Sequence, residues 1–186
     1  MIRFSIAPTL GALATGMLVV TTAASAQTAQ PSSGEVRLHG NDQAFINEAT
    51  KAVSTQRDAA RIAAARSKDR EVKAFAEKVA NDNAMIATEL RAAIPHGVVG
   101  VPKDDPDNAV LESIRNLPGG EFDKTYIENV ALADEQKALS AFQAEIAGGR
   151  NEQLKDAARK ALPTMQEHYA MAQELAKRKH LSEGAQ

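Results

Sequence analysis

Four polar side chains interrupt the apolar faces of four long segments that have helical periodicity. They are Gln56, Asn83, Glu135 and His168. His168 shows the pattern well, because residues at helical spacing on either side of it, such as Met165 and Leu175, are apolar. Carboxylate and imidazole groups on facing helices can bind a metal ion, and they can also hydrogen-bond to one another inside a core. The four residues are therefore candidates for a metal centre or for a structural polar layer.

The residues around these positions favour the structural layer. A di-iron bundle needs a Glu from each of two helices and a Glu-x-x-His motif on each of the other two. Met165 stands three residues before His168, and Ala80 stands three residues before Asn83, so neither motif is present. Asn and Gln are also poor ligands for transition metals. We therefore predict no metal ligand, no catalytic residue, no cofactor-binding residue and no cofactor.

The segments that carry these residues are predicted to be helices. Ala, Glu, Lys, Gln and Arg dominate from residue 42 onward, and no segment alternates like a strand. Asn41 or Asp42 can cap the first helix, Asp69 the second and Asn151 the last. The helices are expected to cover about residues 42–66, 70–94, 120–147 and 152–180. Each polar residue lies near the middle of its helix, so the four should meet at a similar depth in a bundle.

The face of the third helix can be read in more detail. Its buried side is expected to run through Leu132, Glu135, Leu139, Phe142 and Ile146, which repeat every three or four residues. The pair Gly148–Gly149 is expected to end this helix.

The connection between the second and third helices is long. It reads PHGVVGVPKDDPDNAVLESIRNLPGG, too long for a tight antiparallel turn. Asp105-Pro106 is a good start for a short helix, and its apolar side would carry Val110, Leu111, Ile114 and Leu117. Two hairpins joined by such a crossover predict an all-α fold, a ferritin-like up-down four-helix bundle with a long crossover that carries a short helix.

The first 26 residues read as a signal peptide. They contain a positive start, an apolar run and the small residues Ala24, Ser25 and Ala26 at the expected cleavage point. The mature chain would then begin at Gln27, in the periplasm, with no stable membrane insertion. An uncleaved anchor is the alternative, although Pro8 and the lack of stop-transfer charges argue against it. We expect a flexible leader at 27–40, one bundle domain at 41–180 and a disordered tail at 181–186.

Composition excludes several classes of function. The formal net charge is −2, and removing Arg3 leaves 21 basic against 24 acidic residues, so nucleic acid is not an expected partner. The sequence has no cysteine, which excludes disulfides and thiol chemistry. It also contains no glycine-rich phosphate loop and no His-Glu-x-x-His motif. We therefore do not expect an enzyme.

Several stretches resemble a known bacterial family. They are EVKAFAEKV, FDKTYIENV, the Gly-Gly-x-Asn turn and LPTMQEHYAMAQEL. Together with the signal peptide they look like the domain-of-unknown-function family DUF4142, over about residues 42–178. The resemblance implies a ferritin-like four-helix bundle exported to the periplasm, with no established activity. Members often carry Asp-His on the second and third helices, where this sequence has Asp82-Asn83 and Asp134-Glu135. That departure weakens the case for a metal site.

Two functions remain open at this point. The first is a non-enzymatic helical protein of the envelope, related to maintenance or stress, that works through a protein partner or by self-association. The second is a metal-binding ferritin-like protein with a degenerate site in the bundle core. That site would use Glu135 and His168, with Asp82 or Asp58 at its edge.

Overall fold

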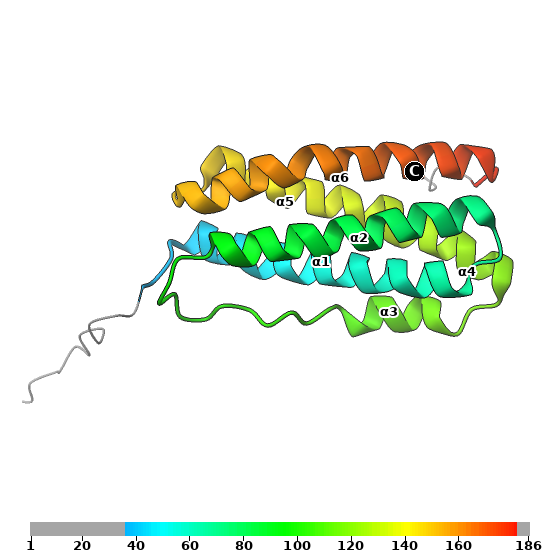
Figure 1. Cartoon of the computed structure of the whole chain (residues 1–186), viewed down its shortest axis with the longest axis horizontal. Helices are drawn as coiled ribbons and strands as arrows, with labels where there is room; N and C mark the ends of the chain where they lie inside the picture. Colours follow the sequence, from blue (N-terminus) through cyan, green and yellow to red (C-terminus); the bar gives the residue numbers. More distant parts are fainter. Residues whose placement is uncertain (1–35, 182–186) are drawn as a thin grey trace, which may run out of the picture. The chain divides into compact units, whose positions relative to one another are not determined.

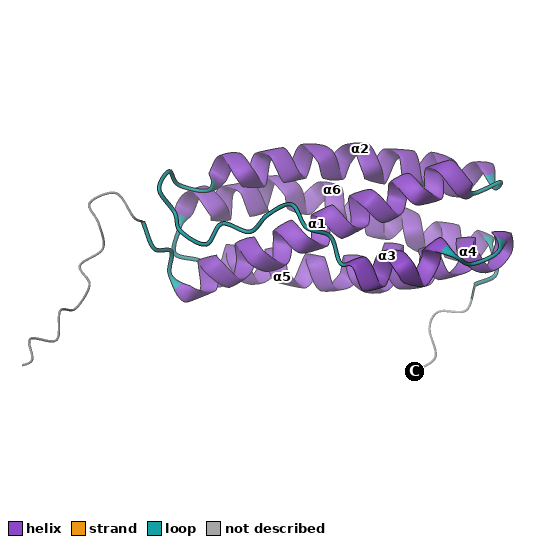
Figure 2. Cartoon of the chain, turned by 90° about the horizontal axis from the view of Figure 1, so that it is seen from below, coloured by secondary structure: helices purple, strands orange, loops and turns teal. Residues whose placement is uncertain are grey.

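A computed structural model describes residues 36–181, which lie within one compact unit. The predicted signal peptide, most of the predicted leader and all but the first residue of the predicted tail fall outside these residues. Within them the chain is helical (Figures 1 and 2), and a single parallel bridge between Val36 and Val98 is the sole β pairing. The elements are α1 Gly40–Arg66, α2 Arg70–Ala93, α3 Asn108–Arg115, α4 Gly119–Thr125, the π-helix η1 Tyr126–Asp134, α5 Glu135–Gly148 and α6 Glu152–Arg178.

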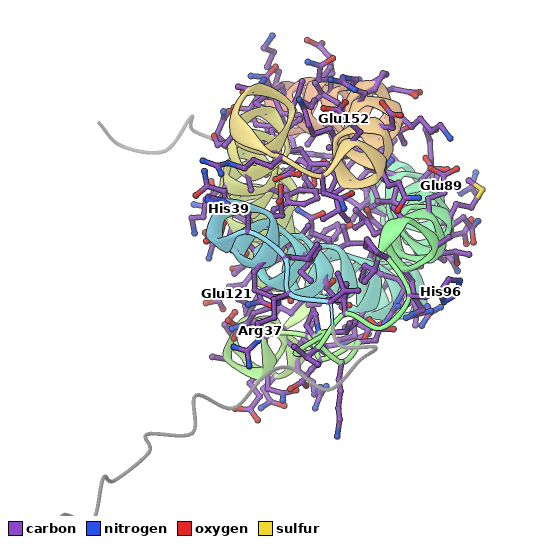
Figure 3. The ribbon with its side chains drawn as sticks, turned by 90° about the vertical axis from the view of Figure 1, so that its left-hand side faces the viewer. Arg37, His39, Glu89, His96, Glu121 and Glu152 are labelled. Atoms are coloured by element: carbon purple, nitrogen blue, oxygen red, sulfur yellow. The ribbon has the colours of Figure 1, made fainter. Side chains whose placement is uncertain are left out.

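These elements form an all-α bundle, as the sequence predicts. Helix α1 packs against α2 and α5, and α6 packs against the same two helices. The order around the bundle is therefore α1, α2, α6, α5. Viewed end on, charged residues such as Glu89 and Glu152 lie on the outside (Figure 3). That the bundle is ferritin-like in particular stays a prediction.

Local capping signals set two of the helix starts. The carboxylate of Asp69 accepts hydrogen bonds from the backbone N–H groups of Glu71 and Val72, at 2.9 and 3.2 Å. The side chain of Asn151 accepts one from the N–H of Leu154, at 3.0 Å. Both caps satisfy N–H groups that have no partner inside the helix. The predicted caps at Asp69 and Asn151 are confirmed.

The predicted cap of the first helix is wrong. Helix α1 begins at Gly40, and its cap is His39. Asp42 is buried instead, and its Oδ1 accepts hydrogen bonds from the N–H groups of Arg150 and Asn151, at 2.7 and 3.2 Å. These donors precede α6, so the carboxylate joins the start of α1 to the start of α6. A sequence motif cannot reveal this role, because the partners lie more than one hundred residues away.

The crossover runs back beside α1 and carries α3, as predicted. Helix α3 starts a little later than expected, at Asn108, because Asp107 rather than Asp105 caps it. The backbone N–H of Asp107 donates to Oγ1 of Thr55 at 2.7 Å, and Nη1 of Arg57 donates to the carboxylate of Asp104 at 2.8 Å. These two contacts fasten the crossover to α1.

The third long helix contains a π-helical segment that was not predicted from the sequence. Elements α4, η1 and α5 are continuous from Gly119 to Gly148. The wider turns of η1 change which side chains face inward, since Val130 and Ala131 are buried and the expected Leu132 is half-buried. The second half regains the expected register, with Leu139 and Phe142 buried.

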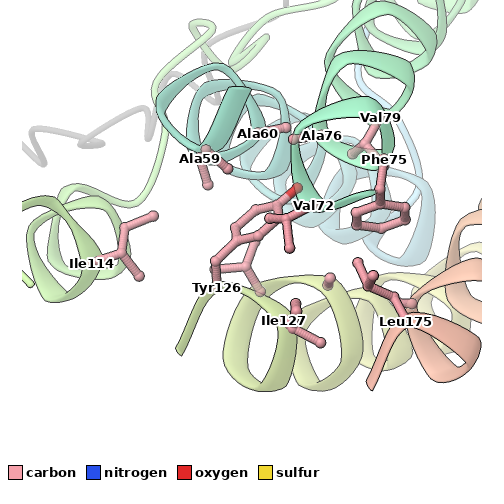
Figure 4. Close-up of a cluster of buried hydrophobic side chains, with 14 of the residues drawn as sticks. Ala59, Ala60, Val72, Phe75, Ala76, Val79, Ile114, Tyr126, Ile127 and Leu175 are labelled. Atoms are coloured by element: carbon pink, nitrogen blue, oxygen red, sulfur yellow. The ribbon is translucent and has the colours of Figure 1, made fainter. Parts of the chain in front are cut away.

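The core consists of two hydrophobic clusters. One surrounds Tyr126 and includes Phe75 and Leu175 (Figure 4). The other includes Phe45 and Phe142, whose rings meet edge to face with centroids 5.1 Å apart. No helix within residues 36–181 is long and apolar enough to cross a membrane.

Candidate functional site

The four predicted polar residues meet between the two hydrophobic clusters. On each long helix the cluster members lie on both sides of the polar residue, for example Ala161 and Met165 before His168 and Ala172 after it. Their exposed fractions are 3% for Gln56, 0% for Asn83, 2% for Glu135 and 1% for His168. We call these four residues, together with Asp82, the polar layer.

His168 has the best defined contact in the layer. Its Nε2 lies 2.9 Å from Oδ2 of Asp82, and Nζ of Lys78 lies 3.0 Å from the same oxygen. Burial raises the pKa of Asp82, but the hydrogen bonds from His168 and Lys78 outweigh it, so the pKa ends below its usual value. An ionised Asp82 accepts a proton donor, so Nε2 of His168 carries the hydrogen and Nδ1 is left with a lone pair.

That lone pair faces a second acceptor. Nδ1 of His168 lies 3.8 Å from Oε1 of Glu135. Burial raises the pKa of Glu135 to about 8, with a smaller opposing effect from the Gln56 amide. Burial also lowers the pKa of His168, although Asp82 opposes this. The environment therefore favours the uncharged form of both side chains.

The side-chain amides of Gln56 and Asn83 are the remaining members of the layer, and they leave some of its polar atoms without a partner. Nδ2 of Asn83 donates to Oε1 of Gln56 over 3.5 Å, a long contact. Four atoms of the layer are buried without a hydrogen-bond partner in the described part of the chain. They are Gln56 Nε2, Asn83 Oδ1, Glu135 Oε1 and His168 Nδ1. Unpaired buried polar atoms are costly, so such a cluster calls for a physical explanation.

A metal ion is a poor explanation for these atoms. If an ion lay ~2.1 Å from both Nδ1 of His168 and Oε1 of Glu135, the N–ion–O angle would be roughly 130°. This angle is wider than a tetrahedral angle or a right angle. Residues 36–181 also contain no group of three His, Cys, Asp or Glu side chains placed to hold an ion. Asp58, the other edge candidate, is bound to Arg57 and Arg61 at 2.9 and 3.3 Å and does not join the layer.

The layer reaches a surface hollow on two sides of the bundle. Gln56 lines a hollow of about 350 Å³ bounded by α1, α3 and α5. Asp82 lines one of about 310 Å³ between α2 and α6. A single side chain, Gln56 on one side and Asp82 on the other, therefore separates the buried residues of the layer from solvent.

A further buried acid, Glu145, was not predicted from the sequence. Glu145 on α5 is buried where the expected Ile146 is half-buried, and its Oε1 has no hydrogen-bond partner. Burial and then the neighbouring Asp42 raise the pKa of Glu145 to about 7. Its spacing of three residues from Phe142 was the available signal, but Ile146 fits the same face and is apolar.

The fold and the layer together define an all-α helical bundle with a buried polar layer at its centre. This chain belongs to the family described as domain of unknown function DUF4142, whose model matches residues 25–175. No curated protein matches it. A solved structure titled as a DUF305 fragment from Deinococcus radiodurans is similar to it, with a TM-score of 0.64 and 15% identity over 77% of this chain and 99% of that one. At this identity the likeness concerns the fold alone.

Proposed function

We propose that this protein is an exported bundle protein that works in the cell envelope without catalysis, through a protein partner or another copy of itself. Burial of the polar layer is the observation that supports this. The layer's imidazole and central carboxyl group, on His168 and Glu135, are 1% and 2% exposed. A substrate would have to open the bundle to reach them, so the outer surface is left to carry the function.

Export is supported by the first 26 residues, whose charge, apolar run and Ala24-Ser25-Ala26 end fit a cleaved signal. The test is to express the full chain in a bacterium and to measure the intact mass of the protein released by osmotic shock. A chain that begins at Gln27 is expected. A matched variant without residues 2–26 should remain in the cytoplasm. Recovery of the full-length chain from the inner membrane would contradict export as a free protein.

Self-association has its own measurement. Sedimentation velocity of the mature chain over a wide range of concentrations is expected to show a reversible oligomer if the partner is another copy. A monomer throughout would leave a different protein as the partner, and crosslinking in the native envelope should then trap a specific heteromeric product. If neither species forms, the partner-binding function is wrong.

A metal-binding function is the second candidate, and one contact favours it. Nε2 of His168 is held by Asp82 at 2.9 Å, and a histidine that binds a metal through one ring nitrogen usually donates its other N–H to such a carboxylate; Nδ1 faces Glu135. The test is the melting temperature with added Fe(II), Mn(II) or Zn(II), since a tight site stabilises by mass action. We expect little change. A large stabilisation that vanishes in both His168→Leu and Glu135→Gln would establish a site.

A further inference from the structure

Two of the unpaired atoms of the polar layer are acceptors that face each other. Oε1 of Glu135 and Nδ1 of His168 lie 3.8 Å apart in the core, and neither has a hydrogen-bond partner. With Asp82 bound at Nε2, Nδ1 is an acceptor. If Glu135 were ionised, two acceptors would face each other in a medium that screens them poorly.

We propose that Glu135 and His168 form a binding site for one proton, which Glu135 carries and presents to Nδ1 of His168, and that loss of this proton weakens the middle of the bundle. The inference does not depend on where the protein works or on its partner. One hydrogen between these two atoms gives both of them a partner once their 3.8 Å separation shortens to hydrogen-bond distance.

The groups that face Glu135 offer no competing cation. Neutral Gln56 faces it from α1, Tyr126 from η1 and His168 from α6. The charged groups of α2 and α6 lie farther from Glu135 and contact one another. Lys78 is bound to Asp82 at 3.0 Å and lies 3.5 Å from Glu167.

The charges of α1 are also occupied elsewhere. Arg57 is paired with Asp58 at 2.9 Å and with Asp104 at 2.8 Å. The described residues thus give Glu135 a histidine as its ion-pair partner and no lysine or arginine.

The location of the proton follows from burial. Moving it from Glu135 to His168 would leave the same number of protons but create a buried cation between two buried anions. Burial raises the pKa of Glu135 to about 8 and lowers that of His168, so both effects favour the proton on the acid. The geometry and the pKa directions agree.

The proton has a route to solvent. From Glu135 it can pass to Nδ1 of His168, and the hydrogen at Nε2 can pass to Asp82. Asp82 lines the hollow between α2 and α6, which Thr164 and Lys160 also line. Exchange through this path needs no unfolding of the bundle.

The layer is also where loss of the proton would have the greatest structural effect. It separates the two hydrophobic clusters, and Glu135 directly follows the π-helix η1. π-Helical turns are rare and occur mostly as short interruptions of α-helices. After the proton leaves, the carboxylates of Glu135 and Asp82 share a single imidazole hydrogen, and the added buried charge would draw in water and loosen contacts between α5 and α6.

The test compares the wild-type protein with Glu135→Gln, which mimics the neutral acid. The matched control is Glu128→Gln on the same helical run, where Glu128 is bound near the surface to Lys124 at 3.9 Å. Thermal unfolding is measured from about pH 5 to pH 9. The melting temperature of the wild type should fall by several degrees relative to Glu135→Gln as pH rises, while Glu128→Gln follows the wild type. Glu145 is present in all three proteins, so its contribution cancels.

A second readout does not depend on the variant folding. The ¹³C resonance of the Glu135 carboxyl carbon in the wild type should report a protonated acid at neutral pH and should titrate well above the usual range for glutamate. A carboxyl group that titrates in the usual range, or parallel melting profiles for the wild type and Glu135→Gln, would overturn the proposal.

Discussion

Replacing Glu145 by Gln should stabilise the protein, and the gain should depend on pH. Glu145 is buried beside Asp42, and its pKa rises from the usual 4.5 to about 7 because burial and the Asp42 charge both penalise the anion. A folded state with the raised pKa retains its proton where the unfolded state has lost it. Its contribution to stability is therefore complete below about pH 4.5 and is lost as pH rises through about 7.

The magnitude follows from the two pKa values. Each pH unit between them costs ~1.4 kcal/mol, so the wild type should lose at most about 3 kcal/mol between pH 4.5 and pH 7 through this group. Gln is neutral at every pH and keeps the shape of the protonated acid. The variant should be nearly as stable as the wild type in mild acid and up to about 3 kcal/mol more stable above neutrality.

The assay is urea unfolding followed by circular dichroism, at several pH values from about 5 to 8. Glu89→Gln is the control, because Glu89 is an exposed acid on the outside of the bundle. Its difference from the wild type should stay small and constant. A stability difference between Glu145→Gln and wild type that does not grow with pH would refute the reasoning, since Glu145 would then be ionised in the folded protein.

Substitutions at three further positions test other parts of the structure. Phe142→Ala should lower the unfolding free energy by ~3–5 kcal/mol in urea melts, because Phe142 is fully buried against Phe45; a loss below about 1 kcal/mol would contradict its place in the core. Asp42→Ala should cost ~2–4 kcal/mol, because it leaves the N–H groups before α6 without their acceptor, and hydrogen exchange there should speed up; unchanged exchange would contradict the contact. His168→Leu should lose little stability in thermal melts and His168→Ala clearly more, because Leu fills the space and Ala leaves a cavity; equal losses would count against a packing role.

Much of the layer was predictable because its signal is local. A single polar residue within an apolar helical stripe is visible in the sequence, and a bundle places the middles of its helices at one depth. The structure accordingly brings together Gln56, Asn83, Glu135 and His168. Asp82 and Asp58 were both named as edge residues, and of the two Asp82 contacts His168 while Asp58 is bound to Arg57 and Arg61.

The features that escaped prediction depend on distant contacts or on backbone hydrogen bonding. Asp42 looks like a helix cap in sequence, but its acceptor role is fixed by α6, which begins 110 residues later. The π-helix is set by which carbonyl each N–H reaches, and side-chain patterns record this poorly. Glu145 is buried in place of Ile146 because positions three and four residues after Phe142 lie on the same side of a helix, and the sequence favours the apolar one.

The layer also explains how this bundle keeps its register. Ala-rich helices pack in several alignments at similar cost, because small side chains present few distinctive shapes. A slip of α6 by one turn, ~5.4 Å, would carry His168 away from Asp82 and Glu135 and into an apolar cluster. An imidazole buried there without a partner costs a few kcal/mol, whereas the same slip among alanines costs little. The polar residues near the middle of each helix therefore favour one alignment of α6 over its neighbours, whatever the state of the proton that Glu135 carries.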